Sequence, residues 1–221
     1  MTDGPVVGNR PVRPVLAPPV PGAAGAMLVI ISGPSGVGKD AVIEALRRRD
    51  GVHDYHYVVT CTTRPRRRGE VDGVSYHFLD IDRFTTLRDA GELLEANEVH
   101  GNWYGTPRAQ VREALLAGRD VILKIDVQGA QVVKENVPEA VLIFIVPPSL
   151  ESLFQRLKSR ATETADELEL RQRNAAIELA RQDDYDYIVE NRDGELEATA
   201  ERIEQILSDE HALHPGRRVV V

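Results

Sequence analysis

A short apolar run, followed by a glycine-rich loop and a lysine, constrains this sequence more than any other feature. The run is Leu28–Ser32, the loop covers residues 33–38, and Lys39 opens a segment with a helical pattern. Glycines let backbone N–H groups turn toward phosphate oxygens, and the helix N-terminus attracts negative charge. Strand, loop and helix in this order are the context that a phosphate-binding loop, or P-loop, requires. The predicted nucleotide-binding residues of the loop are Gly33, Pro34, Ser35, Gly36, Val37, Gly38, Lys39 and Asp40.

The residue after the lysine departs from the P-loop pattern. The pattern has Ser or Thr there, whose hydroxyl helps to hold Mg²⁺, whereas this chain has Asp40. A carboxylate is also a hard oxygen ligand that Mg²⁺ accepts. We therefore predict a nucleotide bound with Mg²⁺ at this loop, and Asp40 as a candidate metal ligand.

Apolar runs alternate with amphipathic segments along most of the chain. Such alternation indicates right-handed crossovers and a doubly wound parallel sheet. We expect an α/β fold of the P-loop type over residues 27–208. The expected strands are 28–32, 57–60, 121–125, 140–146 and 187–190, and the expected helices are 39–49, 107–117, 128–136, 149–158, a long helix that ends near 182, and 196–207.

The two ends of the chain differ from this domain in composition. Residues 1–26 carry six prolines and several glycines, a composition typical of a disordered arm. Met27 stands directly before the first expected strand, so the arm is either a true extension or an artefact of the assigned start. Residues 209–221 are expected to form a flexible tail.

Charge and composition exclude several classes of partner. The net charge is −8 at pH 7, whereas proteins that bind nucleic-acid polymers usually carry a basic surface. The chain lacks an apolar stretch of the ~20 residues that cross a bilayer, so we expect no membrane partner. Its one cysteine, Cys61, cannot form an internal disulfide, which favours the reducing cytoplasm. The sequence does not distinguish a monomer from a homo-oligomer.

A basic cluster interrupts this acidic sequence. Residues 64–68 contain four arginines, and guanidinium groups bind phosphate dianions through two parallel hydrogen bonds. A run of charges is most often a solvated loop. The turn-rich stretch 61–106 also carries Tyr76, Glu95, Tyr104 and Thr106, and this polar set favours a phosphate site instead.

Eight short motifs resemble the guanylate kinase family, in order and at that family's spacing, over about residues 28–207. They are ISGPSGVGK at 31–39, TTR at 62–64, GEVDG at 69–73, YHF at 76–78, GNWYG at 101–105, IDVQG at 125–129, PPS at 147–149 and TET at 162–164. The resemblance implies transfer of the γ-phosphoryl group of ATP to GMP. It also implies a GMP-binding insertion at about 58–107 and a helical lid at about 155–171.

The resemblance implies roles for individual residues as well. Glu95 would accept hydrogen bonds from guanine, because a carboxylate is an acceptor-only group and guanine offers two adjacent donors. Glu70 would support the arginines that hold the GMP phosphate, and Asn191 would contact the adenine of ATP. The implied GMP-binding residues are Thr60, Arg64, Arg67, Glu70, Tyr76, Glu95, Tyr104, Thr106 and Asp126. The implied catalytic residues are Lys39, Arg64, Arg67, Arg156, Arg160 and Arg171.

Two departures from the family pattern stand out. Pro65 lies one place earlier than the family's proline, which shifts the loop that carries Arg67. Lys124 stands where the family carries an acidic residue, and we predict that it forms an ion pair with Asp40. Two alternatives to GMP phosphorylation remain open at this point: a non-catalytic guanylate-kinase-like module that binds proteins, and a kinase for another small phosphorylated acceptor.

Overall fold

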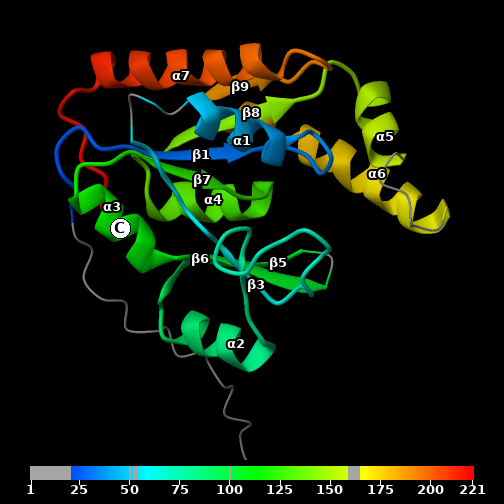
Figure 1. The fold of residues 1–221 in the computed structure, drawn as a ribbon, viewed down its shortest axis with the longest axis horizontal. Helices are drawn as coiled ribbons and strands as arrows, with labels where there is room; N and C mark the ends of the chain where they lie inside the picture. Colours follow the sequence, from blue (N-terminus) through cyan, green and yellow to red (C-terminus); the bar gives the residue numbers. More distant parts are fainter. Residues whose placement is uncertain (1–20, 50, 52–53, 100, 159–164) are drawn as a thin grey trace, which may run out of the picture.

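The computed structural model describes residues 21–49, 51, 54–99, 101–158 and 165–221. Its larger sheet has five parallel strands in the order β2-β7-β1-β8-β9 (Figure 1). These strands are β1 (Leu28–Ser32), β2 (His56–Tyr57), β7 (Val121–Lys124), β8 (Val141–Val146) and β9 (Tyr187–Glu190). The expected parallel sheet is therefore confirmed.

Helices cover both faces of this sheet. The helices α1 (Lys39–Arg49) and α7 (Leu196–Leu213) lie on one face, and α3 (Arg108–Leu116) and α4 (Val127–Asn136) lie on the other (Figure 1). Alternate residues of β1 enter two separate cores, Val29 and Ile31 beside α1 and α7, Leu28 and Ile30 beside α3 and α4. Because both faces of β1 are buried, its sequence is a continuous apolar run.

The stretch expected to be a turn-rich insertion contains a second sheet. Its strands are β3 (Cys61–Thr62), β4 (His77–Phe78), β5 (Leu93–Val99) and β6 (Asn102–Pro107), in the order β4-β3-β6-β5. The helix α2 (Ile81–Asp89) packs on it through the buried ring of Phe84. The expected strand at 57–60 is wrong in extent, because β2 ends at Tyr57 and the chain then crosses from one sheet to the other.

The prediction of a flexible tail at 209–221 is wrong. Helix α7 continues to Leu213, and the side chains of Val219 and Val221 are buried. The backbone N–H of Gly22 donates to the carbonyl of Val219 (2.7 Å), and that of Gly25 donates to the carbonyl of Arg217 (2.9 Å). Residues 21–26, which were expected to belong to the arm, are thus packed against the C-terminal segment, while residues 1–20 lie outside the described part.

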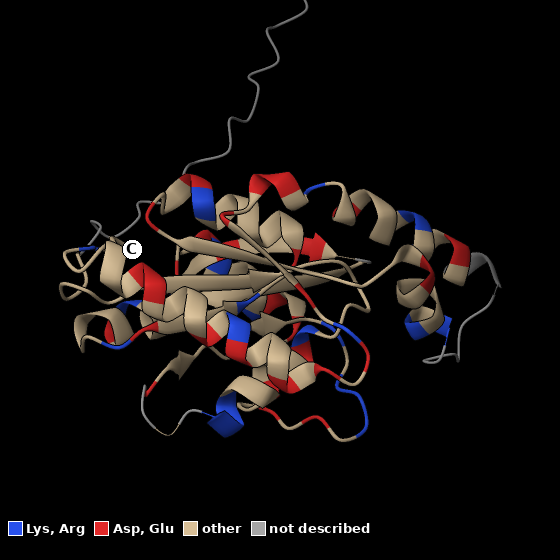
Figure 2. Ribbon diagram, turned by 90° about the horizontal axis from the view of Figure 1, so that it is seen from above, with Lys and Arg blue, Asp and Glu red and all other residues tan. Residues whose placement is uncertain are grey.

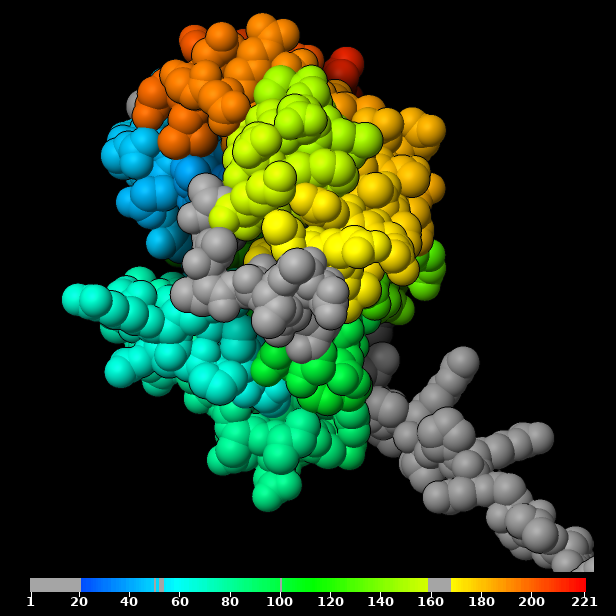
Figure 3. Space-filling view, turned by 90° about the vertical axis from the view of Figure 1, so that its right-hand side faces the viewer, coloured from blue at the N-terminus to red at the C-terminus, as the bar shows by residue number. Residues whose placement is uncertain are grey.

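Two helices stand at one end of the molecule, beyond the carboxyl ends of the large sheet. They are α5 (Leu150–Lys158) and α6 (Ala165–Leu179), and they lie above the small sheet and its loops (Figures 1 and 3). The long helix expected to end near 182 ends at Leu179, and a short 3₁₀ turn, Gln182–Asp184, follows it.

Acidic and basic residues are interspersed along the outer helices (Figure 2). Within the described ranges, no helix is both long enough and apolar enough to cross a lipid bilayer.

Candidate active site

A cavity of about 340 Å³ lies between the P-loop, the end of β7, the small sheet and α6. In doubly wound sheets, ligands bind beyond the carboxyl ends of the strands, as here. The cavity brings together ten residues that the sequence predicts for the site: Gly33, Ser35, Lys39, Thr60, Arg67, Tyr76, Glu95, Tyr104, Asp126 and Arg171. An adjoining hollow of about 440 Å³ adds Asp40, Arg64 and Glu70.

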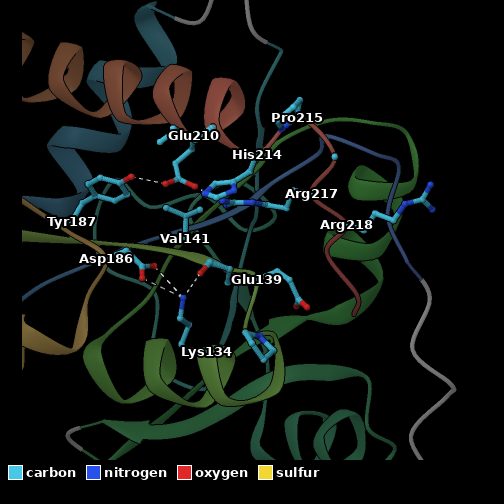
Figure 4. A pocket seen from close by; sticks show the side chains of 14 residues that line it. Lys134, Glu139, Val141, Asp186, Tyr187, Glu210, His214, Pro215, Arg217 and Arg218 are labelled. Carbon is cyan, nitrogen blue, oxygen red and sulfur yellow. Dashed lines mark hydrogen bonds and ion pairs between the residues drawn. The ribbon is translucent and has the colours of Figure 1, made fainter.

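A larger hollow, of about 760 Å³, lies elsewhere, at the amino ends of β8 and β9 (Figure 4). Two of its carboxylates are held in ion pairs: Asp186 with Lys134 at 3.1 Å, and Glu210 with Arg217. None of the residues predicted for the site lines it. We therefore place the candidate active site in the smaller cavity.

The P-loop has a shape that only glycine permits at three points, Gly33, Gly36 and Gly38. Gly33 and Gly38 adopt positive φ values, +144° and +102°. A Cβ at Gly33 would lie 2.4 Å from the carbonyl oxygen of Ile145, and one at Gly38 would lie 2.6 Å from the amide nitrogen of Asn191. The loop thus lies directly against its supporting elements.

Lys39 holds the loop from inside. Its Nζ donates to the carbonyl oxygens of Gly33 (2.6 Å) and Pro34 (3.1 Å). The Lys39 ammonium is poorly solvated, and this burial lowers its pKa from the ordinary value. An anionic ligand would interact strongly with a charge in such a place.

Two predicted residues support the loop from outside. The side-chain amide of Asn191 donates to the carbonyl of Val37 (2.8 Å), and Asn191 is only 6% exposed. Arg156 donates to the same carbonyl (3.0 Å) and pairs with Asp193 (2.7 Å). The expected contact of Asn191 with adenine stays a prediction. Arg160 lies outside the described residues.

Helix α6 contributes one predicted residue and one that the sequence analysis missed. Arg171, predicted for the lid, places its Nη2 3.4 Å from the Ser35 hydroxyl. Glu178 was not predicted, yet its carboxylate accepts a 2.8 Å hydrogen bond from the backbone N–H of Ser35. No local pattern distinguishes Glu178 from the other glutamates of α6, and its partner lies 143 positions away.

The basic loop is held in place by Glu70. This carboxylate pairs with the Arg64 guanidinium at 2.7 Å and accepts from the backbone N–H of Arg67, also at 2.7 Å. Burial acts to raise the pKa of Glu70, but the hydrogen bonds from Arg64 and Arg67 outweigh it and lower the pKa. Arg64 also lies over the ring of Tyr76, 5.5 Å from its centroid.

A buried carboxyl group lies at the base of the cavity. Glu95 is 4% exposed. Its two oxygens accept from the Thr106 hydroxyl (2.6 Å) and from the side-chain amide of Asn97 (2.8 Å). Burial raises the pKa of Glu95 to about 7. The sequence analysis missed Asn97, although a residue two positions along a strand shares a face with Glu95.

Asp126 has a clear structural partner. It is the N-cap of α4, and its Oδ1 accepts from the backbone N–H groups of Gln128 (2.8 Å) and Gly129 (3.1 Å). Asp126 also lines the cavity, where its charge adds to the effect of burial on the pKa of Glu95. Its predicted contact with GMP stays a prediction.

The ion pair predicted between Asp40 and Lys124 is present. The Lys124 side chain is 23% exposed and the Asp40 side chain 76%. Burial acts to lower the pKa of Lys124, but the charges and hydrogen bonds of Asp40 and Tyr76 together outweigh it, and the pKa is raised. Lys124 also lies 5.3 Å from the centroid of the Tyr76 ring.

This arrangement suits the transfer of a charged group rather than covalent catalysis. Cationic side chains and loop N–H groups meet a buried carboxyl group in one cavity. The chain's only thiol, Cys61, is buried beside Phe84 and Leu93. Burial raises its pKa to about 11, so it is not a nucleophile at neutral pH.

Comparison with known proteins shows the family of this chain. The family model described as guanylate kinase matches residues 25–210. The guanylate kinase of Mycobacterium bovis is 46% identical, over 84% of this chain and 89% of its own length. The guanylate kinase of Halalkalibacterium halodurans is 45% identical, with the same two shares, 84% and 89%.

Relatives are also found in plants and among solved structures. A rice protein named guanylate kinase 2, chloroplastic/mitochondrial, is 43% identical over 90% of this chain and 68% of its own. The crystal structure of guanylate kinase from Anaplasma phagocytophilum aligns with a TM-score of 0.67 and 35% identity, over 85% of this chain and 87% of that one. From the extent of these matches, the chain belongs to the guanylate kinase family.

Proposed function

We propose that this protein phosphorylates GMP to GDP with ATP as the donor. The observation that carries the proposal is that the P-loop lysine, Lys39, and the buried carboxyl group of Glu95 line the same cavity. The Lys39 ammonium suits the phosphates of ATP. The Glu95 carboxylate suits the edge of guanine that carries two hydrogen-bond donors. An oxygen of the GMP phosphate would attack the γ-phosphorus in line, while the bond to the bridging oxygen breaks and ADP leaves.

The donor would bind along the P-loop. The N–H groups of residues 33–40 and the Lys39 ammonium would hold its phosphates. Arg171 reaches the loop at Ser35, where its guanidinium would face the transferring group. Arg156 and Asn191 contact the loop carbonyl of Val37, and we assign them to the donor side, as we do Arg160.

Mg²⁺ bound with ATP would neutralise charge on the β- and γ-phosphates. Within the described part of the chain, no three His, Cys, Asp or Glu side chains form a ready metal cluster. Mg²⁺ commonly uses only one or two carboxylates, with substrate phosphates and waters as the other ligands. The exposed carboxylate of Asp40, at the first turn of α1, fits that requirement, and we assign it to the metal.

The acceptor would bind on the small sheet. Arg64, Arg67, Tyr76 and Tyr104 would hold the GMP phosphate, with Glu70 fixing the two arginines. The carboxylate of Glu95 would accept from guanine N1–H and its amino group. Adenine has an acceptor at N1 and would leave that carboxylate unpaired. We assign Thr60 and Thr106, which are buried beside the cavity, and Asp126 to the same guanine site.

The alternatives fit the site less well. A protein-binding module has no need of a buried lysine inside an intact phosphate loop. This chain has such a lysine, Lys39, whose Nζ donates to the loop carbonyl of Gly33. A kinase for another acceptor would need a different partner for Glu95, which is 4% exposed. We further propose that the reaction takes place in the cytoplasm, as the single cysteine of the chain favours.

The test is to identify the products. The protein is incubated with ATP, Mg²⁺ and GMP, and nucleotides are quantified by chromatography. We expect GDP and ADP to appear in equal amounts, and little ADP to form when GMP is omitted. Binding of GMP without any GDP formation would instead favour the non-catalytic module.

A further inference from the structure

Lys124 occupies a position between the donor and acceptor halves of the site. It is the last residue of β7, and it lines both the 340 Å³ cavity and the adjoining hollow that contains Arg64 and Glu70. A lysine at a strand end usually extends its ammonium into solvent, because the charge is strongly hydrated. This one is instead mostly buried and paired with Asp40 of α1.

The surroundings of Lys124 resemble those of Arg64. Both cations lie over the ring of Tyr76, Arg64 at 5.5 Å and Lys124 at 5.3 Å from its centroid. Each is paired with a carboxylate, Glu70 for Arg64 and Asp40 for Lys124. The ring of Tyr104 lies 6.1 Å from that of Tyr76, so two phenol groups and two held cations share one region.

We infer that the ammonium of Lys124 is a further phosphate ligand of the acceptor site, and that Asp40 positions it there. This inference rests on the proposed function, because it assigns Lys124 to the phosphate of GMP. A phosphate dianion placed among Arg64, Tyr76 and Tyr104 would lie in the hollow that Lys124 also lines. Asp40 compensates the lysine charge while that phosphate is absent, as Glu70 does for Arg64.

The two residues of the pair therefore have separable roles. Loss of Lys124 removes a cation from the acceptor phosphate and also removes the lysine partner of Asp40 beside the P-loop. Loss of both residues restores the charge balance beside the P-loop but not the acceptor contact. We therefore expect the loss of GMP affinity to persist in the double variant. The loss of affinity for the donor nucleotide should disappear in it.

The test is calorimetric titration with GMP and, separately, with ADP. Both titrations are done in EDTA, so that no metal and no turnover contributes. For Lys124→Met we expect GMP to bind at least tenfold more weakly, as for other hydrogen bonds to charged groups, and ADP to bind severalfold more weakly. For Asp40→Asn combined with Lys124→Met, we expect ADP affinity to return to within about twofold of the unaltered protein, and GMP affinity to stay low.

Two further variants guard against a purely structural effect. Lys124→Arg keeps the charge and should bind GMP within about threefold of the unaltered protein. Lys134→Met removes a comparable lysine–aspartate pair far from the site and should change neither affinity. Melting temperatures of all variants show that each is folded.

Several results would overturn the inference. Unchanged GMP affinity in Lys124→Met would show that the ammonium does not reach the acceptor phosphate. Recovery of GMP affinity in the double variant would show that Lys124 only neutralises the charge of Asp40 and does not contact the acceptor phosphate. If the unaltered protein fails to bind GMP at all, the proposed acceptor is wrong and the inference falls with it, a result that is visible before any variant is compared.

Discussion

The carboxylate of Glu178 is hydrogen-bonded to the backbone N–H of Ser35 at 2.8 Å, so helix α6 places a negative charge directly on the P-loop. The charge also acts on Lys39, where it opposes the effect of burial on the ammonium. ATP would bring its own negative charges to the same loop. Glu178 and the nucleotide phosphates therefore compete for one group of donors.

Glu178→Gln should strengthen ATP binding. The amide keeps the size of the side chain and removes the charge; like charges about 4 Å apart in water-rich surroundings repel by about 1 kcal/mol. We expect the Kd for ATP, measured by calorimetry, to fall on the order of fivefold. Glu169→Gln is the control, since Glu169 is exposed on the same helix and pairs with Arg173. Weaker ATP binding in Glu178→Gln would mean that the carboxylate supports the loop instead.

Lys39→Met should abolish most of the activity without unfolding the chain. The ammonium provides charge at the phosphates, and methionine keeps the apolar stem that is buried. We expect kcat/KM to fall on the order of 10³-fold, a typical cost of losing one electrostatic group in an active site. Circular dichroism should show an unchanged helix content. Arg48→Met, an exposed change on the same helix, should retain full activity; near-normal turnover in Lys39→Met would exclude the catalytic role.

The stability of the Glu95→Gln variant, measured relative to that of the unaltered protein, should be greater at neutral pH than at acid pH. The pKa of Glu95 is about 7 in the folded chain, against 4.5 ordinarily, because of burial. Between these two values the unfolded chain has lost a proton that the folded chain keeps, so this group reduces stability as pH rises from 4.5 to 7. The full effect, up to about 3 kcal/mol, is reached above pH 7.

Urea unfolding of Glu95→Gln and of the unaltered protein at pH 5 and pH 8 measures this difference. Glu98→Gln serves as the control, because Glu98 is exposed on the same strand. A stability difference that does not grow with pH would contradict the raised pKa.

Truncation after Arg218 should destabilise the fold. It removes Val219 and Val221, whose side chains are buried, together with the hydrogen bond from Gly22. Full burial of one valine contributes about 1.5–3 kcal/mol, so we expect the free energy of unfolding to fall by roughly 3 kcal/mol. Arg218→Ala, an exposed change at the same end, should have little effect. An unchanged urea midpoint in the truncated chain would show that these contacts are not maintained in solution.

The large sheet was predictable because its strands carry their own pattern. β1 and β9 match the expected limits, Leu28–Ser32 and Tyr187–Glu190, since apolar runs bounded by loop residues mark buried parallel strands. Two strands of the small sheet, β3 and β4, were not predicted, because each is only two residues long. A period of two cannot be recognised in so short a segment.

Contacts between distant residues were the second limit. The packing of Val219 and Val221 depends on partners near residue 22 and on α3, which no local pattern reveals. Glu178 was missed for the same reason. The Asp40–Lys124 pair was predictable, because both positions depart in charge from a known pattern and that pattern fixes where they lie.

The central claim is that Glu95 selects guanine in an ATP-dependent kinase. The most direct measurement is kcat/KM with GMP and with AMP, at saturating ATP and Mg²⁺, for the unaltered protein and for Glu95→Gln. A site built to hydrogen-bond its substrate rejects an analogue without the matching groups by ~10⁴-fold or more. We predict a preference of that order for GMP, and its loss by at least tenfold in Glu95→Gln. Comparable turnover of AMP and GMP by the unaltered protein would contradict the account.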